Sequence, residues 1–142
     1  MENPQRGPAV SCVFVCHDAA GRLLLARRSV GARDEPGCWD TGAGALELGE
    51  TFEEAVAREV REEYGTEPLR TRLLGVRNVL RTDPPSHWVA LVFAVLVDPD
   101  APVIGEPDRF DALGWFSPDG LPSPRHSQLD PTLEMFAGAG QP

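Results

Sequence analysis

The chain begins with two short apolar runs that a polar turn separates. Residues 9–16 are apolar and rich in β-branched side chains, as in a strand that is buried on both faces. Residues 22–28 form a second run, and residues 17–21 between them contain His, Asp and Gly, which favour a turn. The pattern predicts a β-hairpin, followed by a loop over residues 29–38.

The clearest helical pattern follows a glycine-rich segment over residues 39–49. Thr51 and Glu54 have the spacing of a capping box, and Gly65 stands where a helix would end. Between these signals the apolar residues recur at helical spacing and would form one stripe: Phe52, Ala55, Val56, Val60 and Tyr64. An amphipathic helix is therefore expected between Thr51 and Gly65.

The second half of the chain contains further strand-like runs and one short helical pattern, with turns rich in Asp and Pro between them. The expected elements are strands at 69–80, 88–97 and 113–116 and a helix at 130–136. No internal repeat or linker interrupts this pattern. One domain is therefore expected over residues 1–142, with loose ends at 1–8 and 137–142.

The amino-acid composition is that of an ordinary globular protein, with an acidic balance. The 22 Asp and Glu against 13 Lys and Arg give a formal net charge of -9, which would repel the backbone of long DNA or RNA. The three cysteines form no C-x-x-C pair, which fits reduced thiols in a cytoplasm better than a disulfide framework. No apolar stretch is long enough to cross a bilayer, so a cytoplasmic location without a membrane partner is expected.

Three carboxylates are expected on one side of the central helix. Glu59, Glu62 and Glu63 stand at positions i, i+3 and i+4, where like charges repel one another. A hard divalent cation would offset this repulsion, and Mg²⁺ prefers such oxygen ligands together with substrate phosphates. Charged helix faces are more often simply solvated, with weak ion pairs such as that of Arg58 with Glu62. The glycine-rich loop before the helix, with Glu50 at the junction, favours a metal–phosphate site.

With its flanks, this helix resembles the signature of the Nudix (MutT-like) hydrolases, G-x5-E-x7-R-E-U-x-E-E-x-G-U, where U is a bulky aliphatic residue. Eight of the nine fixed positions match within 23 residues: Gly44, Glu50, Arg58, Glu59, Val60, Glu62, Glu63 and Gly65. The last position differs, since it is Thr66, and Gly42-Ala43-Gly44 stands where many members have Pro-Gly-Gly. Further similarities at 37–39 and 114–122 extend the resemblance over about residues 9–122.

The resemblance implies an α+β fold, namely a Nudix-type α/β/α sandwich with a mixed β-sheet between helices. It also implies that Mg²⁺, or Mn²⁺ as a substitute, activates water for attack at phosphorus. Arg58 would orient the glutamates through ion pairs, and Glu50 would support the loop or a second metal shell. The metal ligands that it implies are Glu59, Glu62, Glu63 and the carbonyl group of Gly44.

The general base has alternatives within the sequence. Similar proteins use either a glutamate of the signature, for which Glu62 is a candidate, or an acid on a later loop. Glu106 and Asp108 stand on such a loop shortly before Trp115, although a solvated acidic loop would have the same composition.

The residues that would contact the rest of the substrate are more loosely indicated. Arg27 and Arg28 end the second predicted strand, and one of them could bind a phosphate, although a surface role fits as well. Trp39, Trp88 and Phe110 could stack on a base, although aromatic residues at such positions are more often part of the core.

Two substrate classes compete within the resemblance. The first is a nucleoside triphosphate, cleaved to a monophosphate and pyrophosphate, which the segments at 87–91 and 106–110 favour. The second is ADP-ribose or a nucleotide sugar, for which the expected proline is displaced, since position 82 is Thr82. A non-catalytic nucleotide-binding regulatory module is the alternative from another class, but the retained glutamates argue against it. The partner would be a small nucleotide, and homodimers are frequent in the family.

Overall fold

The apolar run that begins the chain becomes the centre of a mixed sheet in the computed structural model, which describes residues 7–139. Strand β1 pairs in parallel with β6 and antiparallel with β2 and β4, and the path across the sheet is β3-β2-β1-β6-β5. Strand β7 pairs with β2. The elements in chain order are β1 (Ala9–His17), β2 (Leu23–Arg28), β3 (Trp39–Asp40), β4 (Gly42–Ala45), α1 (Phe52–Tyr64), β5 (Arg70–Thr82), β6 (Pro85–Leu96), β7 (Phe110–Phe116) and α2 (Leu129–Gly138).

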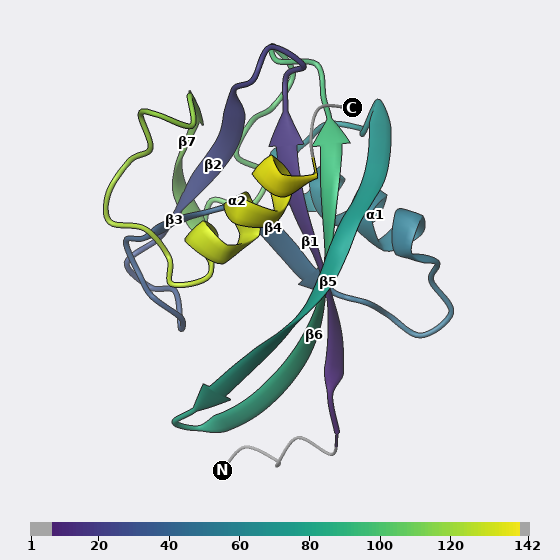
Figure 1. Cartoon of the computed structure of the whole chain (residues 1–142). Coiled ribbons are helices and arrows are strands. Elements are labelled where there is room, and N and C mark those ends of the chain that lie inside the picture. Colours follow the sequence, from purple (N-terminus) through teal and green to yellow (C-terminus); the bar gives the residue numbers. More distant parts are fainter. Residues whose placement is uncertain (1–6, 140–142) are drawn as a thin grey trace.

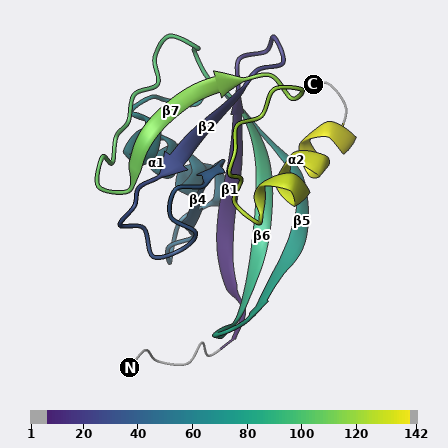
Figure 2. The same ribbon diagram turned by 90° about the vertical axis from the view of Figure 1, so that its left-hand side faces the viewer.

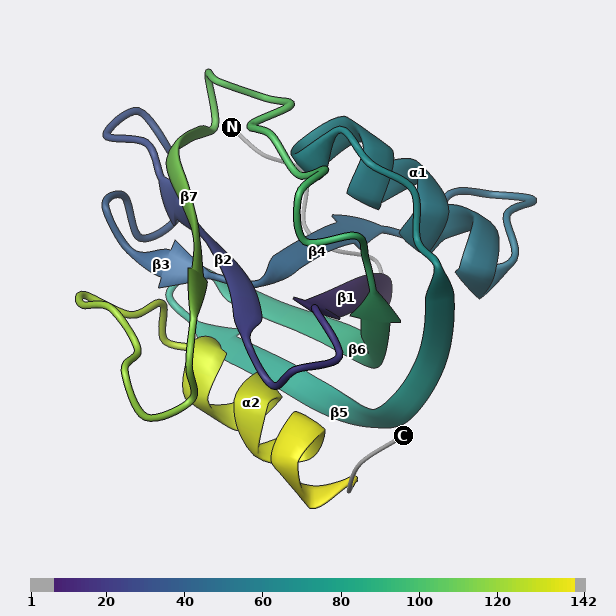
Figure 3. The ribbon, with the colours of Figure 1, turned by 90° about the horizontal axis from the view of Figure 1, so that it is seen from above.

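The two helices cover opposite faces of the sheet, as the view from above shows (Figure 3). Successive side chains of β1 alternate between these faces. Cys12 and Phe14 pack in the core layer that contains Tyr64 of α1, whereas Val13 and Val15 belong to the layer against α2. The predicted α+β sandwich, with a mixed sheet between helices, is therefore confirmed.

Helix α1 forms between the two signals that predicted it. The Thr51 hydroxyl accepts a hydrogen bond from the Glu54 backbone at 3.2 Å, and the Glu54 carboxylate accepts one from the Thr51 backbone at 2.8 Å. Gly65 ends the helix in the left-handed conformation, with φ 64°. Within the described residues, neither α1 nor α2 has the length and apolar character needed to span a membrane.

The glycine-rich segment before α1 differs from the loop that its composition predicted, because most of it pairs with other strands. Gly42 to Ala45 form β4 against β1, and a Cβ atom at position 42 would overlap the ring of Phe14. Glycine therefore allows this strand to approach the core, although it is a poor strand former. Helix α2 is also longer than predicted, so Ala137 and Gly138 are helical rather than loose. Residues 1–6 and 140–142 of the predicted loose ends lie outside the described residues.

The β5–β6 hairpin extends away from the body of the molecule (Figures 1 and 2). Its register runs from the pair Arg70↔Leu96 to the pair Thr82↔Pro85, so the turn is tighter than the predicted loop. The half of this hairpin nearer its turn, with Arg77, Val79 and Arg81 of β5 and Trp88 and Ala90 of β6, lines the cavity described below.

Candidate active site

Arg58, in the middle of α1, joins the loop before the helix to the carboxylates of the helix. Its Nε lies 2.7 Å from Glu50 Oε2, and its Nη1 lies 2.5 Å from Glu59 Oε1. Its Nη2 donates to the Ala45 carbonyl at 3.2 Å. The hydrogen bond between Arg58 and Glu50 raises the pKa of the arginine and lowers the pKa of the glutamate. Both groups therefore stay charged at neutral pH and fix Glu59 relative to β4.

Gly44, on strand β4, lies directly against the Glu59 side chain. A Cβ atom at position 44 would overlap the carboxyl group of Glu59. Glu59 itself is buried, with 7% of its surface exposed. Glycine therefore leaves the room in which this carboxylate sits between β4 and α1. The match of Gly44 to the signature has a steric reason in this chain.

Glu63 is buried more deeply than the other acidic residues of α1, with 1% of its surface exposed. Neither of its carboxyl oxygens has a hydrogen-bond partner within residues 7–139. Burial, together with the neighbouring Glu59, raises the pKa of Glu63 well above its ordinary value. A buried polar group without a partner destabilises a fold by about 1–3 kcal/mol, and more when it is charged. A cation beside Glu63 would supply the missing partner.

We call Glu59, Glu62 and Glu63 the carboxylate cluster. Glu62 is its exposed member, and its Oε2 lies 3.5 Å from Arg58 Nη1. The cluster offers hard oxygen atoms at different depths next to the backbone of β4, and this donor set fits Mg²⁺. The Glu63 oxygens without a partner support a cation site independently of the number of acidic residues.

The loop before β7 packs on the end of α1. The backbone of Gly105 donates to the Glu63 carbonyl at 2.9 Å, and a Cβ atom at position 105 would overlap the Glu62 carbonyl. Glu106 follows and pairs with Arg109 at 3.1 Å, and both charges act on the pKa of Glu63. Asp108 is exposed, and its carbonyl accepts a hydrogen bond from Ser29. Of the two predicted late-loop acids, Glu106 is therefore the one beside the carboxylate cluster.

A cavity of about 370 Å³ lies on the α2 side of the sheet, next to this cluster. Its floor is formed by β4, β1, β6 and β5, and Gly44 and Arg109 connect it to the carboxylate cluster. Four arginines and two aspartates are among its lining residues: Arg28, Arg77, Arg81, Arg109, Asp34 and Asp40. Its wall is therefore rich in cations although the protein is acidic.

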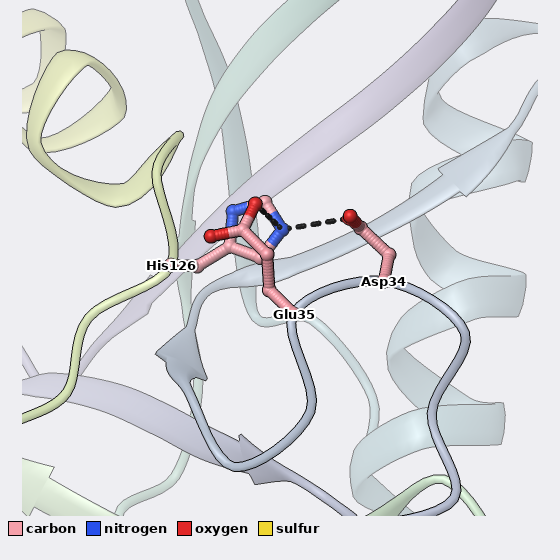
Figure 4. A group of neighbouring side chains, drawn as sticks. All are labelled: Asp34, Glu35 and His126. Carbon is pink, nitrogen blue, oxygen red and sulfur yellow. Dashed lines mark hydrogen bonds and ion pairs between the residues drawn. The ribbon is translucent and has the colours of Figure 1, made fainter. Parts of the chain in front are cut away.

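A network around His126 fixes one wall of the cavity (Figure 4). His126 Nε2 lies 2.8 Å from Asp34 Oδ2 and 3.1 Å from Glu35 Oε2, and the ring is 5% exposed. Arg81 lies 3.2 Å from Asp34 and 3.4 Å from Glu35. Burial opposes ionisation of Asp34, but the hydrogen bond to His126 lowers its pKa below the ordinary value. The network connects the β2–β3 loop to the segment before α2 and to β5.

The same three side chains place potential metal-ligand atoms within 4.8 Å of one another, namely those of Asp34, Glu35 and His126. Each already has partners, because Arg81 contacts both carboxylates and Ser127 donates to Glu35 through its backbone and its hydroxyl. This group is therefore explained as an ion-pair network, in contrast to the partnerless Glu63.

Asp40 is a largely covered carboxyl group on the cavity wall. It lies 3.5 Å from His126 Nδ1, and it accepts a hydrogen bond from the backbone of Thr41 at 2.8 Å. Burial raises the pKa of Asp40 to about 6, and His126 opposes this effect. Asp40 therefore changes charge in a mildly acidic range.

The substrate-contact residues expected from the sequence fall in different places. Arg28 and Trp88 line the cavity. Arg27 instead pairs with Asp111 at 2.7 Å on the surface and lies over the ring of Trp39. Phe110 is 5% exposed and packs in the core layer under α1, so it is not on the cavity wall.

Several cavity residues gave no signal in the sequence. One is His126, which contacts Asp34 across 92 positions of the chain, so no local spacing connects the two residues. A signal did exist on β5, where Arg77, Val79 and Arg81 alternate along a predicted strand and hence share one face.

Comparison with known families agrees with the site. The family model for the NUDIX domain matches residues 5–136, which is most of the chain. This chain belongs to the NUDIX family. The sequence-based assignment to a Nudix hydrolase is thereby confirmed.

Relatives with known structures or names point in the same direction. The solved MutT NUDIX hydrolase from Burkholderia pseudomallei is 36% identical, with a TM-score of 0.83 over 92% of this chain and 98% of that one. The NAD-capped RNA hydrolase NudC of Pseudomonas aeruginosa is 33% identical over the whole chain, which spans 52% of the relative. The ADP-ribose pyrophosphatase of Methanocaldococcus jannaschii is 46% identical over 74 residues, 51% of this chain and 41% of that protein. The chain therefore spans about half the length of such curated relatives, or less.

Proposed function

We propose that this protein is a Mg²⁺-dependent hydrolase that cleaves the diphosphate linkage of a nucleoside-diphosphate-linked small molecule. The observation that carries the proposal is the Glu63 carboxyl group, which is buried beside Glu59 without a hydrogen-bond partner in the described residues. This chain retains all the glutamates of the family signature, and a divalent cation is the partner that this arrangement fits.

Each signature residue then has a role that follows from its contacts. The carboxylate cluster and the Gly44 carbonyl would hold the cation, and Arg58, bound to Glu50 and Glu59, positions them. When bound, Mg²⁺ neutralises charge on the phosphoryl oxygens and lowers the pKa of the attacking water. Positioning and electrostatics account for most of the catalysis in phosphoryl transfer.

We place the general base at Glu106. It would accept a proton from the water molecule that attacks phosphorus, while the P–O bond of the anhydride breaks and the second phosphate leaves. Its position beside the end of α1, paired with a cavity arginine, supports this role. Glu62, which is exposed, is the alternative base within the signature.

The cavity is the place for the nucleoside half of the substrate. Gly44, which lies against Glu59 of the carboxylate cluster, is among its lining residues, and Trp88 offers an aromatic side chain on its wall. We favour a nucleoside triphosphate, cleaved to a monophosphate and pyrophosphate, in keeping with the similarity to a MutT structure over almost its full length.

ADP-ribose or a nucleotide sugar is the second candidate. The specific observation in its favour is the relative named as an ADP-ribose pyrophosphatase, which is 46% identical over about half of this chain. A regulatory module that binds nucleotides without cleaving them is disfavoured, since the three glutamates of the cluster are retained.

Product analysis with Mg²⁺ tests these candidates on a panel of nucleoside triphosphates, ADP-ribose, nucleotide sugars and dinucleoside polyphosphates. Pyrophosphate release from triphosphates supports the first candidate, whereas a monophosphate with a sugar phosphate supports the second. The matched control is the Glu62→Gln/Glu63→Gln protein. Binding without turnover in the wild-type protein would replace hydrolysis by the regulatory function.

A further inference from the structure

The four arginines on the cavity wall differ in their partners. Arg81 pairs with Asp34 and Glu35, Arg109 pairs with Glu106, and Arg28 donates to the Asp34 carbonyl at 2.5 Å. Neither Arg28 nor the fourth, Arg77 on β5, has a carboxylate within ion-pair distance among the described residues. The two differ at Nε, which donates to a backbone carbonyl in Arg28 but is buried without a partner in Arg77.

Arg77 is held by neutral groups on one side only. Its Nη2 donates to Gln128 Oε1 at 2.8 Å, with longer contacts to the Gln128 carbonyl at 3.4 Å and to Thr132 Oγ1 at 3.5 Å. Its Nε is buried without a partner within residues 7–139. Burial lowers the pKa of Arg77, and the charge of Asp40 on the same wall opposes this effect. A guanidinium group in this state gains most from an anion.

The cavity floor leads across the sheet from β4, where Gly44 lies against Glu59, to Arg77 on β5. Ala45, Ser11, Ala90 and Arg77 stand opposite one another in register on β4, β1, β6 and β5, and all four line the cavity. Three strand spacings separate β4 from β5, which is about 14 Å. The small side chains on this floor leave room for a ligand that reaches from one end to the other.

The incompletely paired charge of Arg77 contrasts with the overall charge of the protein. A formal net charge of -9 creates a field that repels anions in general. This cavity nevertheless presents an incompletely paired guanidinium group. Such a group suits an anionic group that is part of a larger ligand, when the rest of that ligand is bound by other residues of the cavity. Guanidinium groups bind phosphate with particular geometric preference.

We propose that Arg77 binds a second phosphate, carried by the ribose of the nucleoside half and separate from the diphosphate that is cleaved. The inference rests on the proposed function only in placing the nucleoside half in this cavity. The preferred substrates would then be nucleotide derivatives with a 2′- or 3′-phosphate, and the same nucleotides without that group would bind more weakly.

Binding to the metal-free protein tests this inference without any turnover. Isothermal titration with AMP, adenosine 2′,5′-bisphosphate and adenosine 3′,5′-bisphosphate compares ligands that contain no anhydride bond, and the two bisphosphates separate the two positions of the phosphate. We expect at least one bisphosphate to bind about tenfold more tightly than AMP at low ionic strength, since hydrogen bonds to charged groups are strong.

Substitutions on β5 identify the group that is responsible. Arg77→Gln should remove the preference for the bisphosphate and leave AMP binding unchanged, whereas Arg77→Lys should keep part of it. Arg72→Gln is the matched control, because Arg72 lies on the same strand with its Nε also buried and partnerless but does not line this cavity. Arg77 also anchors α2, so melting temperatures establish that each variant is folded.

Equal affinities for AMP and both bisphosphates in the wild-type protein would overturn the inference, as would a preference that survives Arg77→Gln. A lack of binding by all three ligands would overturn it too. The proposed function has a separate readout, because Mg²⁺-dependent turnover without a phosphate preference keeps the hydrolase and removes the role of Arg77. A preference for the bisphosphate without turnover keeps the role of Arg77 and removes the hydrolase.

Discussion

The carboxylate cluster and the cavity are adjacent, but they are built in different ways. The cluster comes from three residues within one turn and a half of α1, and Arg58 and Gly44 fix it from nearby positions in the chain. The cavity collects side chains from strands and loops up to about a hundred positions apart, as in the pair of Asp34 with His126. The reaction class thus depends on a local motif, whereas the choice of substrate depends on tertiary structure.

The two regions also contain incompletely paired groups of opposite sign. Glu63 is an acid without a partner, and Arg77 is a cation without a carboxylate, within the part of the chain that the structure describes. Each is unfavourable in the empty site, because a buried polar group costs free energy unless it has a partner. The comparison teaches that a substrate with a metal ion at one end and a phosphate at the other would satisfy both.

The largest effect is expected in the carboxylate cluster. Glu62→Gln/Glu63→Gln should lower kcat by about a thousandfold or more, because the metal contributes several kcal/mol to the stabilisation of the transition state. Steady-state turnover in Mg²⁺ measures this, and AMP binding should be unchanged. A variant that keeps more than a tenth of the wild-type kcat would contradict the assignment of the cluster.

The second effect concerns stability in the cavity region. The folded pKa of Asp40 is raised to about 6, so its contribution to stability is greatest below the unfolded pKa of about 3.9 and is lost as pH rises to about 6. This loss amounts to up to about 3 kcal/mol. Asp40→Asn removes the ionisable group and with it this loss. The free energy of unfolding of the variant should therefore rise relative to that of the wild-type protein as pH increases between these values.

Urea unfolding followed by tryptophan fluorescence, at intervals from pH 4 to pH 7, measures the difference between the Asp40→Asn and wild-type proteins. The difference isolates Asp40 from other buried acids such as Glu63, which are present in both proteins. A difference that does not change with pH would show that Asp40 is not raised in pKa by the fold.

The third effect separates the two late-loop acids. Glu106→Gln should lower kcat by about a hundredfold if this carboxylate accepts the proton of the attacking water. Asp108→Asn is the matched control, since Asp108 is exposed on the same loop and should leave kcat within about twofold. Equal effects of the two substitutions would return the base to Glu62.

The smallest of these effects is expected from Arg58→Lys. Lysine retains the charge but cannot contact Glu50, Glu59 and the Ala45 carbonyl at once, as the guanidinium group does. Activity or metal affinity should fall by about 10- to 100-fold, the usual range for residues that orient metal ligands. A Mg²⁺ titration of turnover separates the two quantities, and full activity at all Mg²⁺ concentrations would exclude a positioning role.

Much of the fold was predictable, and the reasons lie in particular residues. The capping box of Thr51 with Glu54 and the stop at Gly65 are local signals, so the bounds of α1 were predicted closely. Strand β4 was not, because glycine favours loops and only its pairing with β1, where Gly42 meets Phe14, makes it a strand.

The site shows the same division. Glu59, Glu62 and Glu63 could be grouped from sequence because their spacing places them on one side of a helix. The resemblance to the Nudix signature added the other members of the site. Phe110 was a candidate for stacking on a base, but the register of β7 turns it into the core. Arg77 became informative only when the packing of α2 showed which of its contacts are neutral.

The most direct measurement compares the Glu62→Gln/Glu63→Gln and Arg77→Gln proteins on one hydrolysed nucleotide that carries a ribose phosphate. Division of the site into a reactive end and a recognition end predicts that the glutamate variant loses kcat and binds adenosine bisphosphate as the wild-type protein does. It predicts that the Arg77 variant keeps kcat and has a KM about tenfold higher. Loss of the same kinetic parameter in both variants, or turnover that survives without the two glutamates, would contradict this account.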